Sequence, residues 1–192
     1  MIHNLLKDKE IILASGSPRR KEIFDMIGIK ALQIPPHIEE NNFCANPRKL
    51  VTVHAENKAL AVRKMVDNDY LIVGSDTVVF QKTKIMEKPE NKWQAADFLT
   101  KLSGTHHYVY TGIGVSYKNQ IYSAYEKTKV FFRELSAHEI EEYVNTKEPM
   151  DKAGAYGIQG FGSQFVRKIS GCYFNVMGFP VSRFYKLLEE IL

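Results

Sequence analysis

A group of positive side chains stands where a helix is expected to begin. In residues 11–29, IILASGSPRRKEIFDMIGI, an apolar run ends at small polar residues, and Ser17 followed by Pro18 is typical of a helix N-cap and first position. The next residues, RRK at 19–21, fall in the first turn, at the positive end of the helix dipole. Helix N–H groups and forked guanidinium donors together suit a bound phosphate. The alternative, that these side chains point into solvent, stays open on charge alone.

Small residues and further lysines could complete such an anion site. Ser15 and Gly16 would let a ligand approach the backbone, although the stretch lacks the GxxxxGK[ST] pattern of the Walker P-loop. Lys58 falls on the apolar row of a predicted helix, so either its stem covers apolar surface or its ammonium reaches the anion. Lys88 precedes Pro89, a pattern equally typical of an ordinary loop.

One carboxylate interrupts an apolar strand pattern. Asp76 lies within LIVGSDTVVF, residues 71–80, where a buried and unpaired carboxylate would be costly. It therefore needs a partner, a metal ion or a place where the strand opens into a cleft, unless residues 74–77 form a surface bend. A carboxylate held there could ligate a metal or act as a general base. Glu39 and Glu40 in a polar loop are weaker candidates, because such pairs are usually solvated.

The segment DKAGAYGIQGFG, residues 151–162, is rich in glycine without the Rossmann spacing. It is either a mobile loop or a backbone held close to a ligand, with Gln159 offering an amide that could read a base edge. His106 and His107 favour surface histidines over a metal site. Cations, carboxylates and an amide together are the parts of a metal-dependent site for phosphate esters or anhydrides.

The elements that must position these residues alternate between strands and helices. Hydrophobic periodicity and end signals predict a mixed α/β fold with a long antiparallel section in the middle. Residues 118–119 are predicted at the turn of that section, and Ser136 with Glu139 predicts a capping box. The predicted strands are 10–15, 30–35, 70–80 with a hairpin return, two within 106–135, and 163–169; the predicted helices are 18–28, 47–67, 90–102, one opening at 136, and 181–192.

Bulk properties exclude several classes of protein. The chain has 192 residues, 44% hydrophobic and 25% charged, which predicts a single soluble domain over residues 1–192. The net charge of +4 is too small to indicate nucleic-acid binding but is compatible with an anionic ligand. Cys44 and Cys172 lack metal-ligand spacing and predict free thiols in the cytoplasm. No signal peptide or membrane helix is expected.

Six motifs in order resemble the Maf-like nucleoside triphosphate pyrophosphatases. They are LASGSPRR at 13–20, GSDTVV at 74–79, EKP at 87–89, LSG at 102–104, TKEPMDKAGAYGIQG at 146–160 and VMGFPV at 176–181. The resemblance implies hydrolysis of nucleoside triphosphates to monophosphate and pyrophosphate, with a divalent cation, Mg²⁺ or Mn²⁺. It also implies an α/β fold with a mixed elongated sheet flanked by helices and two lobes around a central cleft, similar to the inosine triphosphate pyrophosphatases.

The resemblance also implies roles for single residues. Asp76 matches the general base and metal ligand, and Glu39 matches, more loosely, a loop glutamate near the metal. Arg19, Thr77 and Gln159 match the pattern of the branch that cleaves dTTP and UTP, and differ from the branch that cleaves 7-methyl-GTP. The remaining residues expected to bind the substrate are Ser15, Arg20, Lys58 and Lys88.

Two other functions remain as alternatives at this stage. One is a purine triphosphate pyrophosphatase that removes inosine or xanthosine triphosphate; the other is a non-enzymatic nucleotide sensor that regulates septum formation. Thr77 and Gln159 count against the first, and the presence of Asp76, Lys58 and Lys88 counts against the second. Neither nucleic acid nor a membrane is expected as a partner. The resemblance makes a homodimer a reasonable expectation.

Overall fold

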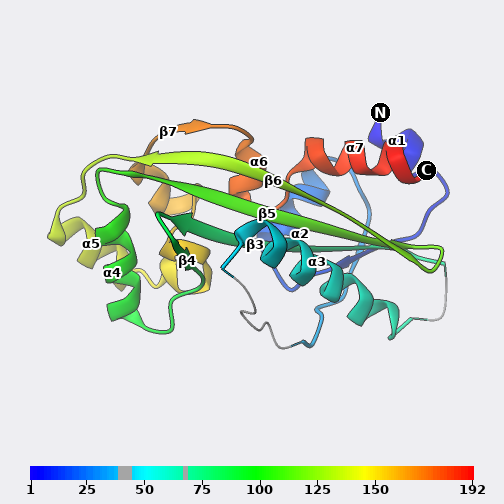
Figure 1. Cartoon of the computed structure of the whole chain (residues 1–192), viewed down its shortest axis with the longest axis horizontal. Coiled ribbons are helices and arrows are strands. Elements are labelled where there is room, and N and C mark those ends of the chain that lie inside the picture. Colours follow the sequence, from blue (N-terminus) through cyan, green and yellow to red (C-terminus); the bar gives the residue numbers. More distant parts are fainter. Residues whose placement is uncertain (39–44, 67–68) are drawn as a thin grey trace.

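A seven-stranded mixed sheet forms the long axis of the protein (Figure 1). A computed structural model describes residues 1–38, 45–66 and 69–192. The strand order is β2-β1-β3-β5-β6-β7, with β4 also paired to β3; β1 is parallel to β2 and β3, and the other pairs are antiparallel. The strands are β1 (Ile11–Ala14), β2 (Leu32–Gln33), β3 (Leu71–Gln81), β4 (Lys84–Met86), β5 (His106–Tyr117), β6 (Gln120–Phe132) and β7 (Val166–Ser170).

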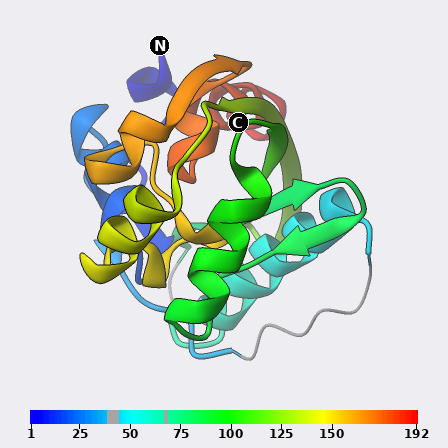
Figure 2. The ribbon, with the colours of Figure 1, turned by 90° about the vertical axis from the view of Figure 1, so that its left-hand side faces the viewer.

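The helices cover the two faces of this sheet unequally. Helix α3 packs along one face, through Leu50, Val51, Ala59 and Val62. On the other face, α2 and α7 cover the end at which both termini lie, whereas α4 and α5 cover the opposite end (Figures 1 and 2). The helices are α1 (Ile2–Leu5), α2 (Pro18–Met26), α3 (Pro47–Arg63), α4 (Lys92–Leu102), α5 (Ala137–Asn145), α6 (Tyr173–Met177) and α7 (Val181–Ile191).

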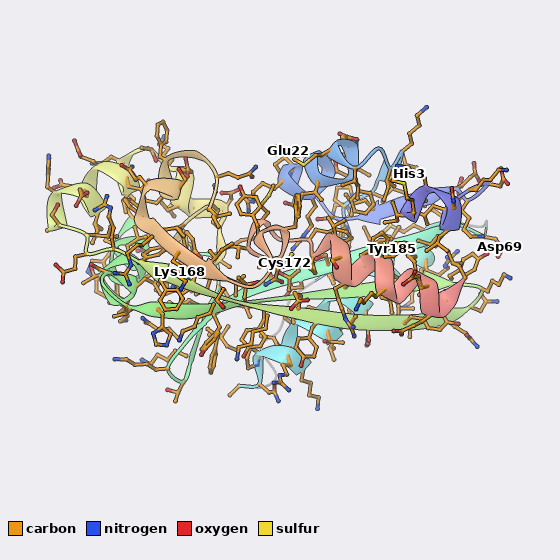
Figure 3. All side chains as sticks on the ribbon, turned by 90° about the horizontal axis from the view of Figure 1, so that it is seen from above. His3, Glu22, Asp69, Lys168, Cys172 and Tyr185 are labelled. Carbon is orange, nitrogen blue, oxygen red and sulfur yellow. The ribbon has the colours of Figure 1, made fainter. Side chains whose placement is uncertain are left out.

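Two separate hydrophobic cores therefore lie on one face of the sheet. One gathers Ile113 and Val115 of β5 with Phe24 of α2 and Phe184 of α7. The other gathers Val109 of β5 with residues of α4 and α5. In Figure 3, Tyr185 of α7 and Lys168 of β7 lie toward opposite ends of the sheet, with Cys172, at the N-cap of α6, between them. The expected mixed α/β fold with an elongated sheet flanked by helices is confirmed.

Strand β3 has a gap on one side between its two partners. Residues 71–74 pair with β1, and residues 79–81 pair with β4, on the side opposite β5. Residues 75–78 are therefore paired only with β5 among the described strands. Asp76 lies in this gap as a buried strand residue, so the alternative of a surface bend at 74–77 is wrong.

Three glycines let α3 come unusually close to the sheet. Gly74 of β3 and its cross-strand partner Gly114 of β5 both face the backbone of Ala55 in α3. A Cβ atom at Gly112 would lie 2.1 Å from the carbonyl oxygen of Val51. Because none of the three carries a side chain, the helix can rest directly on the strands. This close approach brings the side chains of α3 within reach of the gap in β3.

We expect Gly112→Ala to displace α3 and to weaken both the fold and the site. The added methyl group has no space against Val51, and overpacking of this kind typically costs about 1–3 kcal/mol of unfolding free energy. Urea denaturation and nucleotide turnover, measured on the same preparation, check this. A variant with wild-type stability and wild-type turnover would show that the glycine platform is not required.

Most predicted elements are present, with instructive exceptions. The turn at Lys118 and Asn119 has both residues in the left-handed region, with φ values of 47° and 61°, as a tight hairpin of this twist requires. The capping box of Ser136 and Glu139 is confirmed. The strand expected at 163–169 is partly wrong, because residues Gly160–Phe165 form a 3₁₀-helix (η3) before β7 begins. Helices α1 and α6 were not predicted, since they are too short to show a hydrophobic period.

The expectation of two surface histidines is wrong for His107. Successive residues of β5 face opposite sides of the sheet, so His106 is exposed while His107 is fully buried. The His107 Nε2 atom lies 2.7 Å from the hydroxyl oxygen of Tyr156. Burial, with a smaller contribution from the charge of His106, lowers the pKa of His107 from 6.5 to about 3. The imidazole is therefore neutral in the folded protein at neutral pH.

Because His107 is buried and neutral, we expect the protein to lose stability on acidification at pH values well above those at which carboxyl groups titrate. The unfolded chain takes up a proton at His107 below pH 6.5 that the folded chain does not accept until about pH 3, so stability falls as the pH decreases through this window. The expected loss is about 2 kcal/mol between pH 7 and pH 5. Urea denaturation at both pH values checks this. His107→Gln should make the unfolding free energy depend less on pH. His138→Gln, at an exposed site, should leave the pH dependence as in the wild type. Equal pH dependence in the wild type and both variants would contradict the role of His107.

Candidate active site

A single cavity of about 490 Å³ collects the predicted substrate-binding residues. It lies between the two ends of the sheet, where α2 and α6 meet the gap in β3 and the segment 151–159. The predicted residues that line it are Ser15, Arg19, Arg20, Lys58, Asp76, Thr77, Lys88 and Gln159. These residues are far apart in the sequence, so their meeting in one cavity is a result of the fold. Glu39 lies outside the described residues.

Asp76 and Lys58 form a buried ion pair at the floor of the cavity. The Lys58 Nζ atom donates to Asp76 Oδ1 at 2.6 Å, and both side chains are 8% exposed. His54 Nδ1 lies 3.3 Å from the other carboxylate oxygen, Oδ2. Burial alone would raise the pKa of Asp76, but the hydrogen bond from His54 and the charge and hydrogen bond of Lys58 lower it well below its usual range. Asp76 is therefore a carboxylate, and Lys58 is more than a lysine covering apolar surface.

His54 was not among the residues predicted from the sequence to form the site. It precedes Lys58 by four residues on α3, so both side chains lie on one face of the helix. The four-residue spacing of His54 and Lys58 is visible in the sequence and could have indicated His54 as a site residue. His54 is buried like Lys58, and the two side chains approach Asp76 from the same helix.

Arg20 sits inside the cavity at the centre of a hydrogen-bond network. Its guanidinium donates to the carbonyl oxygen of Gly178 at 2.9 Å, to Ser15 Oγ at 3.1 Å and to Thr77 Oγ1 at 3.2 Å. Thr111 donates its only hydroxyl proton to the carbonyl oxygen of Asn175, so Thr77 must donate to Thr111 Oγ1. Thr77 is thus left with an oxygen that accepts from Arg20. The network fixes the guanidinium against β3 before any ligand arrives.

The other two cations at the start of α2 are matched by acids. Arg19 Nη1 donates to Asp151 Oδ2 at 3.1 Å, across the cavity from α2 to the 3₁₀-helix η1 (Glu148–Asp151). Lys21 pairs with Asp25 one turn along α2 and does not line the cavity. Ser17 is at the N-cap, but its side chain makes no capping hydrogen bond. Two of the three positive charges at the helix start therefore have carboxylate partners without a ligand.

The segment 151–159 adds polar side chains to the cavity that were not predicted as site residues, although they belong to the glycine-rich motif. Asp151 and Lys152 both line the cavity, and Lys152 Nζ donates to Asp151 Oδ1 at 2.7 Å. Partial burial acts to raise the pKa of Asp151, but the hydrogen bond from Lys152 and the charge of Arg19 lower it overall. Glu87 and Lys88, just after β4, complete the polar lining. Apolar residues of the same cavity, Val79, Val109 and Val176, offer a surface for a flat ring.

The cavity offers carboxylate oxygens to a hard cation, those of Asp76, Glu87 and Asp151. Among the described residues, no three side chains of His, Cys, Asp or Glu are grouped as a metal site. Magnesium is often held by one or two carboxylates together with phosphate oxygens and water, which Asp76 could match. The donor set fits a cation that phosphate oxygens also help to hold. Within the described part of the chain, no helix is long and apolar enough to cross a membrane.

Comparisons with known proteins show the family of the chain. The profile of the family described as "Maf-like protein" matches residues 10–191. A protein named "dTTP/UTP pyrophosphatase" from Bacillus thuringiensis subsp. konkukian (strain 97-27) is 44% identical over 183 residues, covering 95% of both chains. One of the same name from Clostridium perfringens (strain SM101 / Type A) is 43% identical over 185 residues, covering 94% of this chain and 96% of its own. The chain belongs to the Maf-like protein family.

Proposed function

We propose that this protein hydrolyses dTTP and UTP to the nucleoside monophosphate and pyrophosphate. The observation that carries the proposal is the buried pair of Asp76 and Lys58 at the floor of a cavity also lined by Arg20 and Lys88. A carboxylate beside several cations suits water attack on a phosphate anhydride. The names of the relatives in Bacillus and Clostridium support the same reaction and substrates.

In the proposed reaction, Asp76 accepts a hydrogen bond from the attacking water and aims it at the α phosphorus. A bond forms between the water oxygen and the α phosphorus, and the bond from that phosphorus to the oxygen bridging to the β phosphorus breaks. The water proton passes to Asp76 or to solvent, and the electron pair leaves with pyrophosphate. In this proposal Lys58 shares its ammonium between Asp76 and a phosphate oxygen, and Arg20 and Lys88 bind the other phosphates, supported by the Lys58–Asp76 contact and the cavity lining. Arg19 would have to exchange its Asp151 partner for phosphate.

We propose Mg²⁺ or Mn²⁺ as the cofactor, held by phosphate oxygens together with Asp76 and, as expected from the resemblance, Glu39. A divalent cation supplies charge neutralisation of the triphosphate and polarises the phosphoryl oxygens. Asp76 already receives one nitrogen donor on each oxygen, so a cation would share or replace one of these contacts. The roles of Asp76 as base and as ligand compete for the same two oxygens.

Selectivity for pyrimidines is proposed to depend on Gln159, whose amide can both donate to and accept from a base edge. Thr77 was expected to help to select the substrate directly. Its hydroxyl group is hydrogen-bonded to Arg20 and Thr111, so we propose that Thr77 instead holds the Arg20 guanidinium. The purine pyrophosphatase and the nucleotide sensor remain the alternatives. A cytoplasmic location, a homodimer and a single domain remain predictions, as does likeness to the inosine triphosphate pyrophosphatase fold.

Hydrolysis of UTP in water labelled with ¹⁸O tests which bond is cut. Attack at the α phosphorus places the label in UMP and leaves pyrophosphate unlabelled. Label in orthophosphate with release of UDP would contradict the proposal, because it would mean attack at the γ phosphorus. Tight binding of UTP without any hydrolysis would instead support the sensor.

A further inference from the structure

One carboxylate joins the end of the glycine-rich segment to helix α5. Glu148 Oε1 accepts from the Tyr143 hydroxyl at 2.9 Å and from the Gly162 N–H at 3.1 Å, and its Oε2 accepts from the Phe161 N–H at 3.0 Å. The Tyr143 oxygen in turn accepts from the Gly157 N–H at 3.3 Å. We call Tyr143 and Glu148 the loop clip. It joins the end of α5, the start of η1 and the start of η3.

The loop clip explains two of the four glycines of this segment, Gly160 and Gly162. Gly160 has a φ of 66°, and a Cβ atom there would lie 2.7 Å from Glu148 Oε2. A Cβ atom at Gly162 would lie 2.7 Å from the Tyr143 hydroxyl oxygen. Any side chain at either position would push the clip away from the backbone. Gly160 and Gly162 therefore report close packing against Glu148 and Tyr143, whereas Gly157 lines the cavity.

The loop clip itself stands on a rigid base. Tyr143 is buried on α5, and its ring meets that of Phe165 edge-on with centroids 4.9 Å apart. Burial, reinforced by the charge of Glu148, raises the pKa of Tyr143 well above its usual value, so the hydroxyl keeps its proton and donates to the carboxylate. Lys152 Nζ donates to the carbonyl oxygen of Glu148 at 2.6 Å. The clip is thus connected to the polar lining of the cavity as well as to the core.

Gln159 lies between the clipped residues. Its neighbours Gly157 and Phe161, two residues away on each side, both donate backbone N–H groups to the clip. Gln159 itself lines the cavity. The position of this amide in the cavity therefore depends on a backbone held at both ends by Tyr143 and Glu148.

We propose that Glu148 is a positioning residue that, together with Tyr143, holds Gln159 against the nucleobase and so sets nucleobase selectivity. This inference rests on the proposed function, because it takes the cavity to be a nucleoside triphosphate site. Glu148 touches no substrate atom in this account. It acts through the backbone on both sides of Gln159.

The test uses the full chain with Glu148→Ala, Glu148→Gln, Gln159→Ala and the double variant Glu148→Ala/Gln159→Ala. Binding of the non-hydrolysable α,β-imido analogues of UTP and GTP with Mg²⁺ is measured by calorimetry, beside kcat and KM for UTP and GTP. Ser136→Ala is the matched control, because it removes the cap of the same helix α5 without touching the clip. Hydrogen exchange over residues 156–162 reports the clip without any ligand.

We expect Glu148→Ala to speed exchange over residues 156–162 and to lower the UTP-to-GTP preference about tenfold, mainly through KM, since misplaced contacts lose binding and selectivity together. Glu148→Gln, which keeps one acceptor oxygen, should lose less. The double variant should be no less selective than Gln159→Ala alone, because one effect operates through the other. Ser136→Ala should keep both the exchange pattern and the preference.

If the backbone amides of residues 156–162 exchange at the wild-type rate in Glu148→Ala, the loop clip does not hold this backbone. Faster exchange with an unchanged preference, or an additive loss in the double variant, would overturn its action through Gln159. Failure of the proposed function looks different: the wild type would turn over no nucleotide. Exchange and analogue binding would then still decide whether Glu148 places Gln159.

Discussion

Asp76→Asn is expected to lower kcat for UTP and dTTP by about 10²–10⁴-fold, the usual loss for a positioned acid–base group. The amide keeps the size of the carboxylate but has one acceptor oxygen in place of two and carries no charge. It can neither take the water proton nor hold a cation beside Lys58. Steady-state pyrophosphate release, measured at saturating nucleotide, gives the change in kcat directly.

The variant must be compared with one that changes an acid elsewhere. Asp97→Asn is a suitable control, because Asp97 pairs with Lys101 on the outer turns of α4, away from the cavity. It should turn over nucleotide like the wild type. Circular dichroism of Asp76→Asn should show a folded protein, so that lost turnover is not lost structure. Turnover by Asp76→Asn within threefold of the wild type would refute the assigned role.

Lys58→Met is expected to have the second largest effect, on both stability and turnover. The substitution keeps an unbranched side chain but leaves the buried carboxylate of Asp76 without its ammonium partner. Removing one member of a buried ion pair typically costs about 3–5 kcal/mol of unfolding free energy, and His54 places this case toward the lower value. Loss of one charged donor to the phosphates should also lower kcat/KM for UTP by about 10²–10³-fold.

A second variant separates the two effects. Lys58→Met/Asp76→Leu removes both charges, so urea denaturation should show that most of the stability lost in Lys58→Met is recovered, while turnover falls below that of Lys58→Met. Lys101→Met is the matched control at an exposed pair and should change stability by less than about 1 kcal/mol. If Lys58→Met unfolds at the same urea concentration as the wild type, the ion pair does not hold the site together.

Several of the residues singled out from the sequence line one cavity, and they stood out because they break local rules. Asp76 is a carboxylate in an apolar strand, and Lys58 a cation on an apolar helix row; each needed a partner, and each is the partner of the other. The alternation of apolar residues likewise predicted β3, β5 and β6. Positions that conflict with their local pattern are the ones most often explained by a site.

The sequence could not show which charges pair across the fold. Arg19 and Asp151 are separated by 132 residues, and only the structure shows that they meet. The loop clip was missed for a similar reason. The glycines indicate that other atoms approach the backbone closely, but they do not indicate which residues those atoms belong to. His107 was placed wrongly although alternation in a strand forbids two neighbouring residues from facing the same side. In each case the missing information was the direction of a side chain in three dimensions.

Pyrophosphate release from a panel of nucleoside triphosphates, with Mg²⁺, with Mn²⁺ and with a chelator, decides whether the protein is a pyrimidine nucleotide pyrophosphatase. We expect metal-dependent release from UTP and dTTP, much slower release from GTP and inosine triphosphate, and no release with the chelator. Rapid release from the purine nucleotides alone would contradict the assigned substrates. No release from any nucleotide in the presence of either metal would contradict the assignment of the cavity as a pyrophosphatase active site.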